Sequence, residues 1–286
     1  MRAARPLLAQ RWLAGVLLAC LQAAAASAAS ELTVTAGGRT QKYTTAALLA
    51  HPAATMITVP ADVAYKRPMT YRAVPVAALL GGIPREDSVK FVAGDGFAAT
   101  IAAAPLLASA DDAARAYLAI EPPAPAWPAL KAGSPATAGP FYVVWLRPEK
   151  GRIVPEQWPF QVVRIEGVVP LAVRFPALLP AAGVDPADPI RRGLVVFTTN
   201  CIVCHTFNLA GDAMVGPDLN VPHNPTEYLR EEYLRRLVRN PASVRYWKDQ
   251  KMPGFDAAAI SDRELDELLA YFYYMAKRKV DVPAPR

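Results

Sequence analysis

Thr198–Phe207 reads TTNCIVCHTF, and this stretch decides how the second half of the chain is interpreted. Cys201 and Cys204 are separated by two residues, and His205 follows the second cysteine directly. A C-x-x-C-H pattern is typical of covalent haem attachment, but similar residues also occur in zinc sites and redox-active disulfides. Chance is the fourth interpretation, and it is a poor one because only three cysteines and three histidines occur among 286 residues.

Two of these interpretations lack the residues that they need. A structural zinc site takes four ligands, which a second Cys or His pair normally supplies. The other histidines, His51 and His223, belong to no pair with ligand spacing. A thioredoxin-like motif requires a βαβ context and does not require the histidine. Covalent attachment of one haem c through Cys201 and Cys204 is therefore the prediction.

The chemistry of haem c explains the spacing of the motif. Each thiol adds to one vinyl group of the haem, which gives two thioether bonds. Two intervening residues allow a single turn of chain to reach both vinyl groups. The next residue, His205, is then placed as an axial ligand of the iron. Covalent attachment suits an exported protein, because such a protein could not recover a lost haem.

The N-terminal segment 1–28 has the features of a secretory signal peptide. It combines an arginine-containing start, an apolar run over Trp12–Leu21 and a small-x-small cleavage site at Ala26–Ala28. The apolar run is too short to span a bilayer. We therefore expect export to the periplasm. Two alternatives remain: an uncleaved anchor, or a lipoprotein, because Leu17–Cys20 resembles a lipobox.

Removal of the segment 1–28 would change what the composition implies. The net charge would fall from +6 to +3, because the segment carries three arginines and no acidic residue. So small a charge gives no basis for nucleic-acid binding. Membrane association is expected only if Cys20 is lipidated. Without Cys20, both remaining cysteines belong to the haem motif.

The chain around the motif, over about Asp188–Lys279, resembles class I cytochromes c. VGPDLN, Val215–Asn220, matches the Gly-Pro of that family. The resemblance implies that the carbonyl of Pro217 accepts a hydrogen bond from His205. KMPGF, Lys251–Phe255, resembles the distal methionine loop, which implies that Met252 is the second axial ligand.

Three other side chains could in principle take the place of Met252. Met214 is only nine residues after His205, too close to reach the opposite face of the haem easily. Met275 falls inside a predicted helix, where a methionine usually belongs to the core. His223 lies in a proline-rich loop and is the more serious rival. A methionine ligand raises the iron potential, and two axial ligands leave no open position, which favours electron transfer.

The flanking sequence predicts an all-α domain over residues 188–280. Asp188–Phe197 can form a helix with a proline in its first turn. Ser261 and Glu264 form a capping box before an amphipathic helix. The resemblance implies that these terminal helices cross, with Gly193 allowing close approach and Phe197 and Tyr271 filling the contact.

Two further expectations concern this domain. A middle helix is predicted over about Glu227–Asn240, with inward-facing side chains at Tyr228, Tyr233, Leu234 and Leu237. Arg191–Arg192 is interpreted as solvated charge.

Residues 31–175 predict a β-rich α+β domain, followed by a linker over residues 176–187. Short β-rich runs are bounded by Gly, Pro and polar residues: LTVTAG, ATMITVP, MTYRAVPV, SVKFVAG, FAATIA and FYVVWL. Short helical patches occur at TTAALLAHP and PVAALLGG. Gly94-Asp95-Gly96 has the composition of a hairpin turn, and the Pro/Ala-rich stretch Glu121–Pro140 predicts a loop.

The order of these pieces resembles the molybdopterin-binding domain of the sulfite oxidase family. The matching pieces are YRAVPVAALL, GDGF, GPFYVV and WPFQVVRIE. That family binds molybdenum through a cysteine, and no cysteine occurs between Ser30 and Cys201. We therefore expect a domain without molybdenum that serves as a docking or positioning module.

Together these patterns predict a periplasmic electron carrier and not an enzyme. The expected partners are a periplasmic dehydrogenase as donor and a cytochrome or terminal oxidase as acceptor. Arg245, Lys248 and Lys251 precede Met252 and could steer an acidic partner; ordinary surface charge is the alternative. Two other functions remain open: an oxidoreductase whose first domain binds a pterin or another small substrate, and a haem-based redox sensor.

Overall fold

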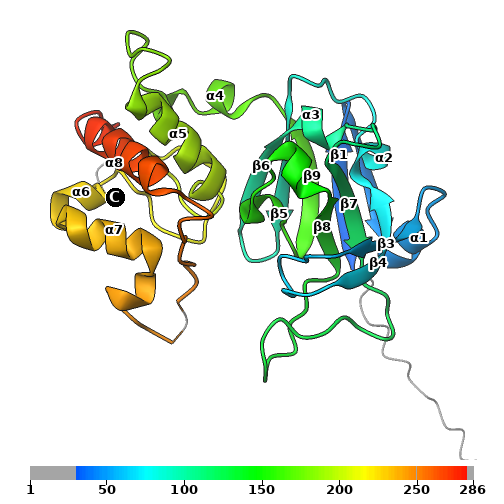
Figure 1. Ribbon diagram of the computed structural model, residues 1–286. Helices are drawn as coiled ribbons and strands as arrows, with labels where there is room; N and C mark the ends of the chain where they lie inside the picture. Colours follow the sequence, from blue (N-terminus) through cyan, green and yellow to red (C-terminus); the bar gives the residue numbers. More distant parts are fainter. Residues whose placement is uncertain (1–29, 249, 282–286) are drawn as a thin grey trace, which may run out of the picture.

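The structure is a computed structural model that describes residues 30–248 and 250–281. The predictions for the signal peptide and for Cys20 concern residues outside these ranges. Within them the chain forms a β-rich part, the β-domain, and a helical part, which lie side by side (Figure 1). This arrangement agrees with the predicted two-domain fold class at the level of secondary structure.

The elements of the β-domain are, in order, β1 (Glu31–Ala36), β2 (Arg39–Thr44), α1 (Thr45–Leu49), β3 (Thr55–Val59), β4 (Met69–Pro75), α2 (Val76–Leu79), β5 (Ser88–Ala93), β6 (Ala98–Ala102), α3 (Ala103–Leu106), β7 (Arg115–Ile120), β8 (Phe141–Leu146), η1 (Pro148–Gly151), η2 (Pro155–Gln157) and β9 (Val162–Val168). Those of the helical part are α4 (Leu171–Arg174), η3 (Pro176–Leu178), α5 (Pro189–Asn200), α6 (Pro225–Tyr228), α7 (Glu231–Arg239), η4 (Pro241–Ser243) and α8 (Asp262–Ala276).

Two sheets enclose the core of the β-domain. One has the strand order β2-β1-β9-β5-β6 and the other the order β3-β4-β7-β8. Neighbouring strands are antiparallel except β1 and β9, which are parallel. Large side chains from both sheets, such as Phe91, Tyr71 and Trp145, are fully buried in one hydrophobic core. The strand β6 forms the edge of its sheet next to the helical part (Figure 1).

All six predicted β-rich runs form strands, and both helical patches form short helices. Gly94–Gly96 forms the predicted hairpin turn between β5 and β6, with Gly96 at φ +93°, a region that favours glycine. The stretch Glu121–Pro140 contains no helix or strand.

The helical part is built around the crossing of α5 and α8. A Cβ on Gly193 would lie 2.0 Å from the backbone oxygen of Glu267, so only glycine allows this approach. Phe197 stacks beside Tyr271, with ring centroids 5.9 Å apart. Asp188 caps α5, and Ser261 with Glu264 forms the predicted capping box of α8.

Three expectations for the linker and the middle helix need correction. The segment 176–187 is not a free linker, because Leu178 is fully buried in the helical core and its carbonyl accepts a hydrogen bond from Tyr271. The predicted middle helix is divided into α6 and α7, because Leu229 adopts an extended conformation. Tyr228 and Tyr233 are exposed, whereas Leu234 is buried.

Arg191–Arg192 is not simply solvated charge. Arg192 forms an ion pair with Glu267, a carboxylate that is only 8% exposed. Arg191 donates to the carbonyl of Val184. Both arginines therefore contribute to the packing at the start of α5.

Candidate functional site

The C-x-x-C-H motif forms a tight turn at the end of α5. Cys201 caps the helix through a bond from its N–H to the carbonyl of Phe197. The N–H groups of Cys204 and His205 both donate to the carbonyl of Cys201, at 3.1 and 3.0 Å. One turn of chain therefore brings the two thiols and the imidazole together, as double attachment of a haem requires.

The two cysteines form no disulfide in this structure. Burial, reinforced by the negative charge of Glu156, raises the pKa of the Cys201 thiol to about 12. Burial, with the charges of Asp95 and Glu156, raises the pKa of Cys204 to about 11. Both side chains are therefore neutral thiols near pH 7, unlike the thiolate of a redox-active C-x-x-C motif.

The imidazole of His205 is held through one of its two nitrogens. Its Nδ1 atom lies 2.8 Å from the carbonyl oxygen of Pro217. A carbonyl can only accept, so Nδ1 carries the proton and the lone pair of Nε2 is free for a metal. Burial lowers the pKa of His205, which favours the neutral, ligating form. This contact is the one that the resemblance to class I cytochromes c implies for Pro217.

Gly216 makes the close approach to His205 possible. A Cβ at Gly216 would lie 2.4 Å from Cε1 of the imidazole, closer than real Cβ atoms come to another heavy atom. The N–H of Gly216 donates to the carbonyl of Cys204 at 2.7 Å. The Gly-Pro pair thus closes back on the motif. The two thiols, the oriented imidazole and this glycine fit a covalently bound haem.

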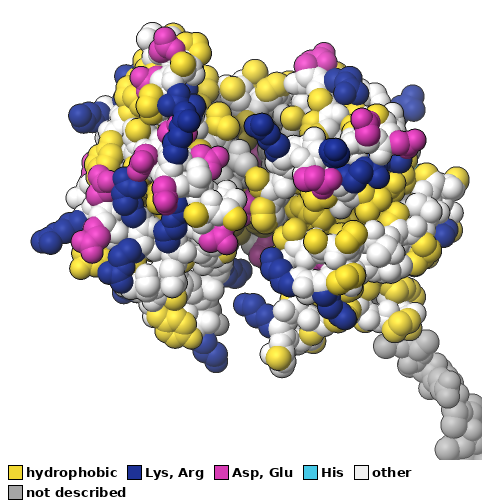
Figure 2. All heavy atoms as spheres, viewed as in Figure 1, with side chains coloured by type: hydrophobic (Ala, Val, Ile, Leu, Met, Phe, Trp, Pro, Cys, Tyr) yellow, Lys and Arg dark blue, Asp and Glu magenta, His cyan; other side chains and the backbone are white. Residues whose placement is uncertain are grey.

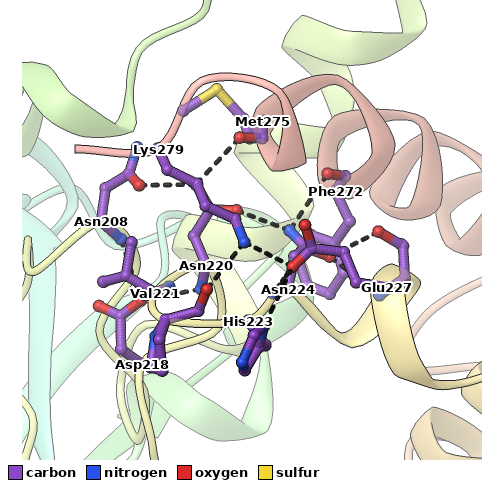
Figure 3. A network of polar contacts seen from close by, with 12 residues as sticks. Asn208, Asp218, Asn220, Val221, His223, Asn224, Glu227, Phe272, Met275 and Lys279 are labelled. Carbon is purple, nitrogen blue, oxygen red and sulfur yellow. Dashed lines mark hydrogen bonds and ion pairs between the residues drawn. The ribbon is translucent and has the colours of Figure 1, made fainter. Parts of the chain in front are cut away.

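A buried polar network holds the Gly-Pro loop in place (Figure 3). The carboxylate of Asp218 accepts from the backbone N–H groups of Asn208, Leu209, Asn220 and Val221. It lies next to Pro217 in the chain. The carboxylate of Asp218 therefore fixes the backbone both before and after the Gly-Pro pair.

The network also joins this loop to the end of α8. The side chain of Asn220 donates to the side-chain oxygen of Asn208 at 2.6 Å and to the carbonyl of Met275 at 2.9 Å. Asn224 donates to Asn220 at 2.8 Å and to the carbonyl of Phe272 at 3.2 Å. Asn220 and Asn224 are fully buried. Asn220 is thus a second donor to the carbonyl of Met275, which also accepts from the backbone N–H of Arg278 at 2.8 Å.

Asp218, Asn220 and Asn224 are site residues that the sequence patterns above do not predict. The signal was present in VGPDLNVPHNP, where short amides and a carboxylate alternate with prolines. Such side chains bond readily to nearby backbone groups in loops. Their partners on α8 are about 50 residues away in the sequence, so spacing alone could not identify them.

The candidates for the second axial ligand occupy different environments. Met252 is half-buried in an irregular segment that is anchored to α7, because the N–H of Phe255 donates to the carbonyl of Val238. Met214 is 84% exposed, and Met275 is buried in the helical core. His223 is exposed, with Nδ1 4.0 Å from the carboxylate of Glu227. Met252 as the axial ligand stays a prediction.

Two further properties of the described residues concern membrane-spanning helices and clusters of metal-binding side chains. No helix within residues 30–248 and 250–281 has both the length and the apolar character of a membrane span. Over the same ranges, no three or more His, Cys, Asp or Glu side chains gather as a metal site would require.

Comparison with known proteins identifies the domain. The family described as "Cytochrome C oxidase, cbb3-type, subunit III" matches residues 188–272, which include α5, the motif, Pro217 and Met252. A search of curated proteins found no match to the chain. Residues 188–272 therefore form a c-type cytochrome domain, and this domain carries covalently bound haem c.

Proposed function

We propose that this chain is a periplasmic electron carrier whose β-domain serves as a docking module. The observation that supports it best is the contact between His205 and Pro217 beside two unpaired thiols. When bound, haem c supplies an iron that accepts and releases one electron. Cys201 and Cys204 would hold it covalently and His205 would ligate the iron, while Pro217 orients the imidazole. Met252 is the proposed second axial ligand.

The proposed partners are redox proteins of the periplasm. The donor is a dehydrogenase, and the acceptor is another cytochrome or a terminal oxidase. The matching family is named after a subunit of an oxidase, which supports an acceptor of that class. The N-terminal segment 1–28 has the sequence features of an export signal, which supports the location.

The basic residues before Met252 are the proposed contact for an acidic partner. Arg245, Lys248 and Lys251 are all exposed. Attraction of an acidic partner raises the association rate at low salt and fades as salt rises. Reversal of Arg245 and Lys248 to Glu should therefore slow electron transfer and flatten its salt dependence, with Lys251 left in place because it pairs with Asp95 of the β-domain. Arg39→Glu is the control, because it introduces the same type of charge on β2, at the opposite edge of the sheet from β6.

A second candidate function is an enzyme that transfers electrons to its own haem. A cavity of about 330 Å³ between the two domains favours it, lined by Glu156, Thr199 and Val203 among others. One carboxylate oxygen of Glu156 is buried there without a hydrogen-bond partner. A small substrate with a hydrogen-bond donor could meet this oxygen.

Elemental analysis of the exported, haem-loaded protein separates the carrier from an enzyme of the molybdenum-dependent kind. One iron per chain and no molybdenum would support the carrier with a docking module that resembles a molybdopterin domain but has lost the metal. Stoichiometric molybdenum beside the iron would contradict it. The chain would then be an oxidoreductase that holds this metal without cysteine.

A further inference from the structure

The β-domain contacts the haem attachment turn directly. The N–H of Ala98 donates to the carbonyl of Val203 at 3.1 Å, and Val203 lies between the two cysteines of the motif. The N–H of Met214 donates to the carbonyl of Gly96 at 3.2 Å. Backbone hydrogen bonds therefore join the hairpin between β5 and β6 to Val203 in the attachment turn and to Met214 in the loop that follows it.

Charged side chains hold the same interface. Asp212 of the helical part accepts from Arg174 at 2.5 Å and from Lys90 of β5 at 3.2 Å. Lys90 also pairs with Glu166 of β9 at 2.7 Å. The side chains of Lys90, Arg174 and Asp212 are only 14–17% exposed. Removing one partner from such a cluster leaves largely buried charges uncompensated, which costs more than the loss of a surface pair.

Apolar residues are buried at this interface although they belong to neither domain core. Val203, Ala213 and Ala98 are at most 5% exposed, yet both hydrophobic core clusters lack them. They are therefore buried by the contact between the domains. Both residues between the cysteines, Ile202 and Val203, are apolar, which suits a covered turn. On the face seen in Figure 2, the domains meet above and leave a hollow below.

We propose that the β-domain is an internal docking partner that covers the outer side of the haem attachment turn. When bound, the haem would be held along one edge by Cys201 and Cys204. An external redox protein therefore cannot approach this edge while the β-domain is docked. It must use another edge, or the Lys90–Asp212–Arg174 cluster must open first. The contact between the domains does not depend on the proposed function. The blocked approach of an external redox protein does, so the inference deepens that function and rests on it.

Two measurements test the contact without any electron transfer. A Cβ at Gly96 would lie 3.6 Å from Cβ of Met214, within the range of a disulfide. Gly96→Cys with Met214→Cys should therefore form a disulfide between the domains in the exported protein. The positive φ of Gly96 strains a cysteine there, so the native chain provides the second measurement. Its exposed Lys251 and Asp95, 3.8 Å apart, should be joined by a zero-length carbodiimide cross-linker.

A third measurement tests the consequence of the contact. Asp212→Lys would repel both Lys90 and Arg174 and should open the interface. Oxidation of the reduced haem by ferricyanide and by tris(phenanthroline)cobalt(III) should then become about two- to tenfold faster. The two probes have opposite charges, so a faster rate with both indicates access and not attraction. Asp111→Lys is the control, because it makes the same charge change at an exposed site in the β-domain.

The outcomes distinguish this inference from the proposed function. A Lys251–Asp95 cross-link together with faster oxidation of Asp212→Lys supports the internal docking partner. Adding the Gly96–Met214 disulfide to Asp212→Lys should restore the slower rate. Absence of both the disulfide and the cross-link, or unchanged rates with both probes, would overturn it. If the contact between the domains forms but the protein exchanges no electrons with any redox protein, the carrier function is refuted and the internal docking stands.

Discussion

The imidazole of His205 and the carbonyl of Pro217 are joined by a 2.8 Å contact that leaves Nε2 as the ligating nitrogen. With haem bound, this hydrogen bond would make the imidazole a stronger electron donor to the iron, which would favour the oxidised state. Much of the chain around it serves this one contact: Gly216 permits it, and the network of Asp218, Asn220 and Asn224 fixes it. The first two predictions follow from that dependence.

Gly216→Ala should displace the Pro217 loop, because the new Cβ would lie 2.4 Å from the imidazole of His205. Loss of the hydrogen bond should raise the haem potential by about 40 mV, the equivalent of ~1 kcal/mol for one electron. A redox titration of the purified protein measures this shift. Gly183→Ala is the matched control, since nothing lies within 4 Å of a Cβ there. An unchanged potential in Gly216→Ala would show that the contact does not tune the iron.

Asn220→Ala should destabilise the domain by about 2–3 kcal/mol, because it removes three buried hydrogen bonds: those to Asn208 and Met275 and the one from Asn224. Denaturation of the haem-loaded protein in urea measures the loss. Asn220→Asp has nearly the same shape but cannot donate, so it should be about as harmful. Asn240→Ala is the control at an exposed asparagine. If Asn220→Asp were as stable as the native chain, the donated hydrogen bonds would not be what holds the loop.

Local sequence signals predicted the elements that are defined by local chemistry. The alternating apolar runs became strands, the capping box at Ser261 begins α8, and Gly193 lies at the helix crossing. β2 was missed because almost all of its residues are exposed, so its pattern has no buried face. β7 was missed because it is buried on both faces and shows no alternation.

Contacts between residues that are far apart in the chain could not be predicted from local sequence patterns. The motif itself and the Gly-Pro that follows could be identified from spacing. Leu178 could not be assigned to the helical core, because its partner Tyr271 is 93 residues away. Likewise, nothing near Asp212 indicates that Lys90, on a strand 122 residues earlier, would pair with it. Such pairs depend on how the domains dock, which no local pattern encodes.

Met252→Ala should remove the predicted axial ligand and lower the haem potential, because a methionine ligand raises it. The half-buried position of Met252 beside the anchored Phe255 is consistent with that role. The visible spectrum and a redox titration check the change. Met214→Ala and His223→Ala, at exposed rival positions, should leave both readouts as in the native chain. A larger effect from His223→Ala than from Met252→Ala would reassign the ligand.

Glu156→Gln should stabilise the protein at neutral pH but not at acidic pH. Burial raises the pKa of Glu156 above 4.5, and one of its oxygens has no partner. The folded state therefore binds this proton more tightly than the unfolded state, so the native carboxylate costs stability as pH rises from about 4.5 through the raised value. Glutamine has no such cost. The difference in unfolding free energy between the variant and the native chain should grow over that range and then stay constant. Urea denaturation from pH 4 to 8 measures it, with Glu149→Gln as an exposed control. A difference that is the same at every pH would mean that the carboxylate of Glu156 is not desolvated in the folded protein.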